Sequence, residues 1–383
     1  MYKSRLARVL VTDGGQKHTL GLVRHLGMHN VEVDVLSFRR GSICSHSKYC
    51  QDEYIIDYSD PFLLERLSSI LQKKKYDLLI PVGTESVKIC SKYKNYIEVY
   101  TDIICVDQEK LGVALSKEKT LKFADSLGIR VPRTFYPRSI EDAPSGVDVV
   151  GTPVVIKARQ ELGISVVDYA HSFDEFVSKY RSMCDLHGFN KENLPLVQEY
   201  IHGTGYGFFA LYDNGKLVNF FQHRRRREYP ASGGMSVAAE SSRRVDVFNN
   251  GRKLLDALEW HGIAMVEFRA TQSGDIYLME INPKYWGSLD LCLEAGVNFP
   301  LNMLQMAKSV PVERSEYRYP FKYHWPLHGD ILLALSAPSQ ALDVLKDIFD
   351  PSVKSNIWVR DDIAGTLGFL PDLALKLWRK FIA

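Results

Sequence analysis

Short apolar runs alternate with amphipathic stretches through residues 1–112. The apolar runs predict strands at 9–11, 31–38, 54–57, 77–82 and 103–106. Two stretches with helical periodicity, 17–26 and 61–73, lie between these runs. Strands that alternate with helices are typical of a parallel sheet covered by helices, so we expect a Rossmann-like α/β domain here.

The pattern changes after this region. A helix is predicted over 116–127, because Ser116 is a favourable N-cap and Gly128 follows the last apolar position. Segment 137–152 is rich in Pro, Gly, Ser and Asp, which predicts a loop. Further strands are predicted at 153–157, 196–201, 263–269 and 276–281.

The last two of these strands predict a hairpin with a defined register. Residues 272–275 between them have the composition of a tight turn. A turn centred in this segment places Glu267 directly opposite Glu280. It also places Arg269 opposite Leu278, on the same face as Glu267.

Two glutamates that face each other across neighbouring strands repel unless a cation lies between them. Asn282 continues the face of Glu280, because side chains repeat every two residues along a strand. Two carboxylates and an amide oxygen suit magnesium, with nucleotide phosphates and water completing its shell. The alternative is a pair of solvated glutamates on an exposed hairpin; the nearby Lys284 and Arg269 favour the metal.

Basic residues occur at two further positions that suit an anion. Lys157 ends a predicted strand and could hold a phosphate as a point charge, although alone it would be interpreted as a surface lysine. In the run Arg224–Arg227, strand alternation places Arg225 and Arg227 on one face, where they could bind an anionic substrate. The Gly233–Gly234 loop that follows would let the backbone approach that ligand.

Composition and charge mainly exclude classes of protein and kinds of site. The chain has 383 residues, 48 Lys+Arg against 46 Asp+Glu, and a formal net charge of +2, which argues against a dedicated nucleic-acid binder. No apolar run is long enough for a transmembrane segment or a leader peptide. The six scattered cysteines predict reduced thiols and a cytoplasmic protein, and Cys44, His46 and Cys50 lack a fourth neighbour for zinc.

The first predicted turn does not favour a dinucleotide. The Gly14–Gly15 pair lacks the Gly-x-Gly-x-x-Gly spacing, and Asp13 would repel an anion, so a plain tight turn is the better interpretation. Residues 81–85 end another strand and could face a ligand crevice, which makes Glu85 a candidate substrate contact.

Five short motifs, taken in order, resemble the ATP-grasp superfamily of carboxylate–amine/thiol ligases, in its carbamoyl-phosphate-synthase-like subgroup. They lie at 116–119, 154–157, 197–201, 266–268 and 279–284. The resemblance runs from about residue 8 to about residue 307. It implies an α/β and α+β protein with three parts: a Rossmann-like pre-ATP-grasp domain at 1–112, a two-lobed ATP-grasp domain at 113–324 (lobe A about 113–200, lobe B about 201–324), and a small helical extension at 325–383.

The resemblance also implies roles for individual residues. Those expected to contact ATP are Lys119, Lys157, Gln198, Glu199, Tyr200 and Ile201. The expected ligands of Mg²⁺ (or Mn²⁺) are Glu267, Glu280 and Asn282. Catalytic contacts to phosphate or an acyl phosphate fall to Lys284, Arg225 and Arg227. Candidate substrate contacts are Glu85, Ser232 and Arg269.

Three positions depart from the subgroup's pattern. Lys284 stands where arginine is usual, so the charge is kept but the bidentate fork is lost. The loop after Lys157 contains only Gly163, where many relatives have several glycines. The segment around Tyr206 lacks an acid that some relatives use. All three bear on the geometry of the ATP loop, and the expected metal ligands are present.

The activity that the resemblance implies is an ADP-forming, ATP-dependent carboxylate–amine ligase that acts through an acyl phosphate. Its substrates would be a small carboxylic acid and an amine, in the synthesis of an amide or peptide-like metabolite or in glycan modification, and a homodimer stays open. The alternatives are a bicarbonate-phosphorylating carboxylase or carbamoyl-type subunit, a non-catalytic ATP-binding module, and a Rossmann-type oxidoreductase, which the missing glycine motif disfavours.

Overall fold

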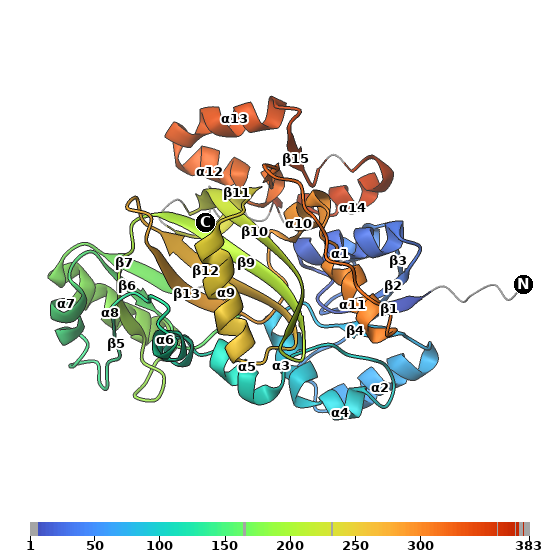
Figure 1. Ribbon diagram of the computed structural model, residues 1–383, viewed down its shortest axis with the longest axis horizontal. Helices are drawn as coiled ribbons and strands as arrows, with labels where there is room; N and C mark the ends of the chain where they lie inside the picture. The colour runs from blue at the N-terminus through green and yellow to red at the C-terminus, as the bar shows by residue number, and fades with distance from the viewer. Residues whose placement is uncertain are drawn as a thin grey trace, which may run out of the picture.

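The computed structural model describes residues 7–163, 166–230, 233–357, 359–371, 373–374 and 378. Within these ranges the chain forms one parallel sheet, one antiparallel sheet and one larger sheet that is antiparallel except for its last strand pair, and the three lie side by side across the molecule (Figure 1). The predicted class, an α/β domain followed by two α+β lobes, is confirmed.

The N-terminal sheet has the strand order β3-β2-β1-β4, and its strand pairs are parallel. Its strands are β1 (Arg8–Val11), β2 (Glu32–Ser37), β3 (Cys50–Ile55) and β4 (Leu78–Ile80). The helices and the 3₁₀ turn that accompany them are α1 (Lys17–Met28), η1 (Ile43–His46), α2 (Leu63–Lys73), α3 (Thr84–Lys92) and α4 (Lys94–Ile97). The strand predicted at 103–106 is wrong: this segment makes a single parallel bridge, from Ile103 to Leu79.

The turn after β1 is closed by its own aspartate. Asp13 has φ 61°, and its Oδ2 accepts hydrogen bonds from the amide of Gly83 (2.8 Å) and the hydroxyl of Ser86 (2.5 Å). These donors belong to the start of α3, so Asp13 ties two strand-to-helix turns together. An anion would have to displace this carboxylate, which agrees with the prediction of a plain tight turn.

The smaller antiparallel sheet, lobe A, has the strand order β5-β8-β6-β7. Its strands are β5 (Thr134–Phe135), β6 (Val154–Lys157), β7 (Val167–Ala170) and β8 (Leu196–Glu199). Helices α7 (Ser145–Val150) and α8 (Phe173–His187) pack against this sheet, whereas α5 (Gln108–Ala114) and α6 (Lys117–Ser126), which precede it in the chain, contact β13 of the larger sheet.

Helix α7 was not expected, because its composition predicted a loop. Val147 and Val150 are buried in the core of lobe A. A Cβ on Gly146 would lie 2.9 Å from Phe135 Cδ1 and 3.0 Å from Val197 Cβ, so a side chain there would force the helix away from the sheet. Close tertiary packing therefore outweighs the local loop propensity.

The larger sheet, lobe B, has the order β13-β12-β9-β10-β11-β14-β15. The strands are β9 (Thr204–Asp213), β10 (Lys216–Tyr229), β11 (Met235–Ser241), β12 (Gly262–Ala270), β13 (Ile276–Asn282), β14 (Lys322–His324) and β15 (Val353–Ser355). Helix α9 (Val245–Ala257) covers one face (Figure 1). Alternate β9 residues separate the two cores: Phe208 lies in the core on the α9 side, and Phe209 in the core shared with the N-terminal sheet.

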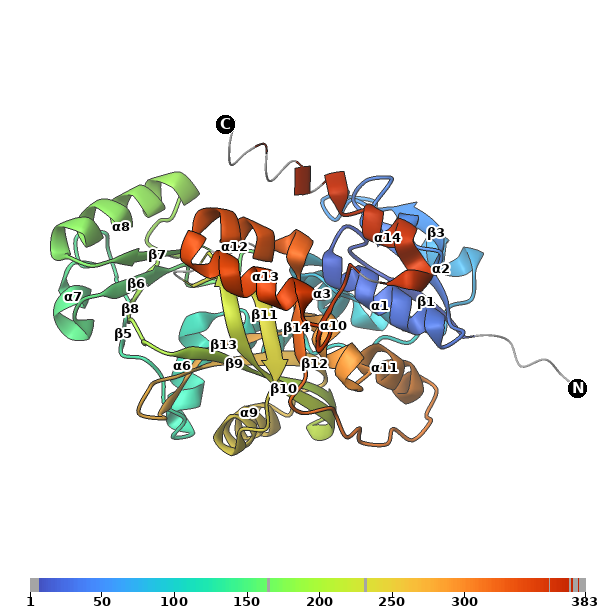
Figure 2. The same cartoon turned by 90° about the horizontal axis from the view of Figure 1, so that it is seen from above.

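The C-terminal segment crosses the molecule above lobe B and reaches the N-terminal domain (Figure 2). Its helices are α12 (Asp330–Ser336), α13 (Ala341–Phe349) and α14 (Ile363–Leu367), with 3₁₀ turns η2 (Pro326–His328), η3 (Pro338–Gln340) and η4 (Arg360–Asp362). Before them, α10 (Leu289–Ala295) and α11 (Phe299–Ala307) pack against α1. A buried ion pair of 2.7 Å between Arg24 and Asp362 anchors the end of this segment. No helix in the described ranges is long and apolar enough to cross a membrane.

Candidate active site

The predicted pair of glutamates is present. Glu267 on β12 lies directly opposite Glu280 on β13. Asn282 faces the same side, and its Nδ2 lies 3.0 Å from Glu280 Oε1 and 3.3 Å from Glu267 Oε1. Among the residues that the structure describes there is no cluster of three His, Cys, Asp or Glu side chains, so a metal here would rest on two carboxylates and an amide.

The register beyond this pair differs from the prediction. An irregularity after Glu267 places Arg269 opposite Tyr277, and Leu278 pairs with Phe268 instead. Arg269 still reaches the site: it lies 3.4 Å from Glu228 Oε2 and donates to the carbonyl of Gly203 (3.1 Å). The turn alone could not reveal a slip inside the strands.

Basic side chains surround the two carboxylates. Lys117 Nζ lies 3.1 Å from Glu280 Oε2, and Arg225 Nη2 lies 2.5 Å from Glu267 Oε2. Burial opposes ionisation of Glu280, but Lys117 and Lys157 together lower its pKa to about 2. Burial raises the pKa of Glu267, and Arg225 opposes that shift. Each carboxylate is thus stabilised by a cation that a metal ion could replace.

Lys117, rather than the predicted Lys119, points into the site. Ser116 caps α6 by accepting from the Lys119 amide (3.3 Å), so the helix begins at Lys117. Two residues apart on a helix lie on nearly opposite sides, and the Lys119 side chain is exposed. Lys117 is the lysine beside Glu280, and the ATP contact expected of Lys119 stays a prediction.

Lys157, at the end of β6, is held by the segment that joins the two lobes. Its Nζ donates to Gln198 Oε1 (2.9 Å), and Gln198 Nε2 donates to Thr134 (2.9 Å). Burial lowers the pKa of Lys157 to about 8, with Lys117 adding to the shift and Glu280 opposing it. A buried lysine fixed by a neutral amide can turn toward a phosphate without breaking an ion pair.

The other residues of the joining segment are placed in different ways. Glu199 forms an ion pair with Arg133 (3.1 Å), so its carboxylate is directed toward the residue that precedes β5. The Tyr200 ring packs edge-on against Tyr169, and Ile201 is buried. Adenine contacts by this segment stay a prediction.

Lys284 connects three parts of the chain. Its Nζ donates to the hydroxyl of Thr84 in the N-terminal domain (2.7 Å) and to Glu161 in the loop after β6 (3.1 Å). Glu161 also lies 3.8 Å from Lys117. The predicted substrate contact Glu85 instead pairs with Lys88 at the surface, so Thr84 is the residue of that turn that reaches the site.

The arginine run divides between two environments. Arg225 donates to Glu267 and to Glu228 (3.1 Å), whereas Arg227 donates to both oxygens of Asp330 in α12 (2.8 and 2.7 Å). The prediction that Arg225 and Arg227 share a face is wrong, because irregularities in the β10–β11 pairing fall between them and after Arg227. The candidate Ser232 lies outside the described residues.

These contacts form one connected row, in which cations and carboxylates alternate except at the centre, where Asn282 joins the two glutamates. The order is Lys284, Glu161, Lys117, Glu280, Asn282, Glu267, Arg225, Glu228 and Arg269. Sequence reasoning missed Thr84, Lys117, Glu161 and Glu228. A signal existed for Lys117, the first residue after the N-cap, and for Glu228, which directly follows the arginine run. Thr84 and Glu161 needed the tertiary fold.

The oxygen atoms in this row of contacts suit magnesium. Glu267 and Glu280 offer carboxylate oxygens from neighbouring strands, and rotation of the Asn282 amide would present its oxygen between them. Cations that now neutralise the carboxylates would become available for phosphates once a metal ion took their place. The residues therefore fit Mg²⁺ together with a nucleotide.

Comparisons with known proteins find one family model and several distant relatives. A family model described as "ATP-grasp in the biosynthetic pathway with Ter operon" matches residues 191–326. The N-terminal section of the carbamoyl phosphate synthase large chain from Aquifex aeolicus is 26% identical over 129 residues, which cover 32% of this chain and 23% of that protein. The chain thus spans less than a quarter of this relative's length.

Solved structures match over more of the chain. An N5-carboxyaminoimidazole ribonucleotide synthetase in complex with ADP has a TM-score of 0.66 at 15% identity, covering 99% of this chain and 100% of that one. An L-amino acid ligase from Bacillus licheniformis has a TM-score of 0.62 at 12% identity, covering 80% and 75%. At these identities the match describes the fold.

Proposed function

Because the chain belongs to the ATP-grasp superfamily, we propose that it is an ADP-forming ligase that joins a small carboxylic acid to an amine. The observation that carries the proposal is the arrangement of Glu267, Glu280 and Asn282 among Lys117 and Lys157. Two carboxylates for a divalent cation and two lysines for phosphates are what binding of a magnesium–nucleotide complex requires.

In the proposed reaction a substrate carboxylate attacks the γ-phosphate of ATP, and ADP leaves. Mg²⁺ held by Glu267, Glu280 and Asn282 would neutralise charge on the phosphate oxygens. Lys157 would turn from Gln198 toward the phosphates, and Lys117 would be released from Glu280 for the same purpose. Phosphoryl transfer needs positioned charge more than a protein nucleophile, and the site supplies such charge.

The second step needs a shielded acyl phosphate. Lys284 holds the turn at Thr84 and the loop at Glu161, so it links the N-terminal domain with lobe A across the site. This contact would keep water from the reactive intermediate while an amine attacks it. The cation on Lys284 would also stabilise the departing phosphate.

The direct test is ADP release by Glu280→Ala and Asn282→Ala. We expect each variant to fold, as judged by circular dichroism, and to lose ATP turnover by about a thousand-fold, since each removes a metal ligand. The exposed Glu316 provides a control, and Glu316→Ala should retain turnover. Unchanged ADP formation in either site variant would remove the basis of the metal assignment.

A second candidate is phosphorylation of bicarbonate. The similarity to carbamoyl phosphate synthase large chains favours it. The two activities separate in one assay: a ligase releases ADP in response to an organic acid and an amine, whereas a bicarbonate-phosphorylating subunit responds to bicarbonate alone. ADP release that depends only on bicarbonate would replace our proposal with this one.

A further inference from the structure

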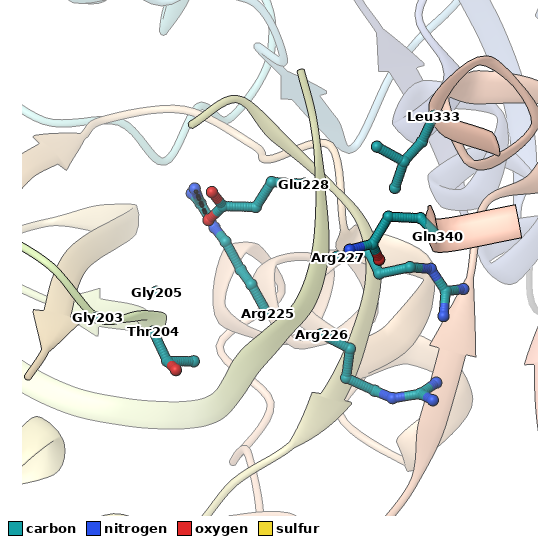
Figure 3. A pocket seen from close by; sticks show the side chains of 9 residues that line it. All are labelled: Gly203, Thr204, Gly205, Arg225, Arg226, Arg227, Glu228, Leu333 and Gln340. Carbon is teal, nitrogen blue, oxygen red and sulfur yellow. Dashed lines mark hydrogen bonds and ion pairs between the residues drawn. The ribbon is translucent and has the colours of Figure 1, made fainter. Parts of the chain in front are cut away.

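A pocket of about 220 Å³ lies beside the glutamate pair, on the side of Glu267. Its lining combines the start of β9, the end of β10 and the C-terminal helices. The lining residues are Gly203, Thr204, Gly205, Arg225, Arg226, Arg227, Glu228, Leu333 and Gln340. Figure 3 shows Arg225 and Glu228 converging on the side of the β9 glycines, while Leu333 and Gln340 lie across β10 from them.

Each arginine of this pocket is already paired with a carboxylate. Arg226 donates to both oxygens of Asp347 (2.7 and 3.0 Å), and Arg227 is held in the same way by Asp330. Arg225 is shared between Glu228 and Glu267. An anionic ligand would therefore have to compete with a carboxylate for each guanidinium.

Glu228 has room for another partner. Each of its oxygens meets one guanidinium, from Arg225 (3.1 Å) and Arg269 (3.4 Å), whereas a carboxylate offers about four acceptor positions. The hydroxyl of Thr204 and the side-chain amide of Gln340 have no hydrogen-bond partner among the residues that the structure describes. On the side of Glu228 the pocket thus offers one carboxylate and the hydroxyl of Thr204, and Gln340 and Leu333 lie on its other side.

The position of the pocket relative to the phosphate site matters as much as its chemistry. Lys117 and Lys157 gather on the Glu280 side of the carboxylate pair. The pocket opens on the Glu267 side, and only the guanidinium of Arg225 separates Glu228 from Glu267. A ligand held by Glu228 would approach a phosphorylated carboxylate from the side away from the phosphates.

We propose that this pocket binds the amine substrate, a primary amine of about amino-acid size whose ammonium group is held by Glu228. Thr204, on the same side of β10 as Glu228, binds its remaining polar group, and Gln340 and Leu333 close the far side of the pocket. The inference rests on the proposed ligase function and names the chemistry of its second substrate. It also gives the C-terminal segment a role, because α12 and η3 form one wall of the pocket.

The chemical step balances with Glu228 as proton acceptor. The bound ammonium gives one proton to Glu228, and the nitrogen lone pair forms the C–N bond with the acyl carbon. The C–O bond to phosphate breaks, and phosphate leaves with its electrons. The second amine proton passes to the phosphate, and Glu228 returns its proton to solvent, so the products are amide, HPO₄²⁻ and H⁺.

The test compares two probes that differ in one group. L-alaninamide carries an ammonium where L-lactamide carries a hydroxyl, and binding of each is measured by calorimetry on the full chain saturated with Mg²⁺ and a non-hydrolysable ATP analogue. We expect L-alaninamide to bind at least about ten-fold more tightly, since an ammonium–carboxylate hydrogen bond is lost with lactamide. Glu228→Gln should remove this difference, and the matched control Glu316→Gln should keep it.

The other outcomes are equally decisive. Equal binding of L-alaninamide by Glu228→Gln and wild type, tighter binding of L-lactate than of L-alaninamide, or no binding of either probe overturns the proposal. If Glu228→Gln does not fold, Thr204→Phe decides, because it fills the pocket without touching the ion pairs and should abolish binding. Failure of the ATP analogue itself to bind would instead contradict the proposed ligase function.

Discussion

Two polar clusters in this molecule use their carboxylates differently. At the turn after β1, Asp13 accepts from a backbone amide and a hydroxyl, which are neutral donors that also bond to each other's residues. In the candidate active site, Glu267 and Glu280 are neutralised by long cationic side chains. The first cluster is complete as it stands, whereas the second can exchange its partners for a metal and a nucleotide.

The difference lies in what a ligand would have to displace. A nucleotide at the β1 turn would leave the Gly83 amide and the Ser86 hydroxyl to be satisfied again, at a cost of about 1–3 kcal/mol per buried group. In the candidate active site, Mg²⁺ would take the place of a cation, and the released lysine or arginine would meet a phosphate. Each charged group would gain a new partner of opposite sign, so binding there would leave few groups unpaired.

The sharpest test of this contrast is a pair of lysines two residues apart. Lys117→Ala should lower ATP turnover by about a hundred-fold to a thousand-fold, because a cation beside Glu280 and the phosphates is lost. Lys119→Ala should change turnover less than about two-fold, because its side chain is exposed on the opposite side of α6. Steady-state ADP release measures both.

This pair also decides between the motif and the structure. The motif suggested Lys119, whereas the observed N-cap at Ser116 places Lys117 beside Glu280. A loss of turnover in Lys119→Ala with Lys117→Ala unaffected would assign the phosphate contact to Lys119. Both variants keep the helix N-cap, so a change in folding is not expected to obscure the result.

A substitution at the β1 turn should lower the stability of the protein and leave ligand binding unchanged. Asp13→Asn keeps a residue that tolerates positive φ but loses the charged acceptor of the Gly83 amide and the Ser86 hydroxyl. We expect the free energy of unfolding to fall by about 1–2 kcal/mol, measured by urea titration. Affinity for Mg·ADP should stay unchanged, and a loss of affinity without loss of stability would place a nucleotide contact at this turn.

Much of the fold and the centre of the site could be predicted from the sequence, for a physical reason. The turn predicted that Glu267 and Glu280 lie near each other on neighbouring strands, but their direct pairing also needs the irregularity after Glu267, because next to the turn Ala270 pairs with Ile276. Lys157 could be placed because it ends an apolar strand. Local rules suffice wherever a residue's direction follows from its own element.

The failures arose where an element departs from regularity or meets another part of the chain. Irregular pairing along β10 turned Arg227 toward Asp330, and a slip after Glu267 moved the partner of Arg269. Thr84 reaches the site because the N-terminal domain packs against the lobes, which no local pattern reports. The same reason explains why Glu85, next to it in sequence, lies at the surface.

The smallest expected effect is a pH dependence of the affinity for Mg·ADP, which should arise from the candidate active site and not from the β1 turn. Burial lowers the pKa of Lys157 to about 8, so above pH 8 the free protein carries this lysine neutral while the phosphates of a nucleotide favour its charged form. Binding of Mg·ADP must then take up a proton, and affinity should fall by up to about ten-fold per pH unit above 8. Calorimetric titrations between pH 7 and 9.5 measure this slope.

Two variants separate Lys157 from other causes of such a slope. In Lys157→Arg the side chain stays charged throughout this range, so affinity for Mg·ADP should become nearly independent of pH. Asp13→Asn should keep the wild-type slope, because its turn takes no part in binding. Without a ligand, the free energy of unfolding should change with pH in the opposite sense. The pKa of Lys157 in the folded protein lies below its value in the unfolded chain, so this lysine opposes folding below pH 8. The free energy of unfolding therefore rises as the pH increases from 8 toward the ordinary pKa of lysine. A slope for Mg·ADP that persists in Lys157→Arg would assign the proton to a different group and leave Lys157 as an ordinary charged contact.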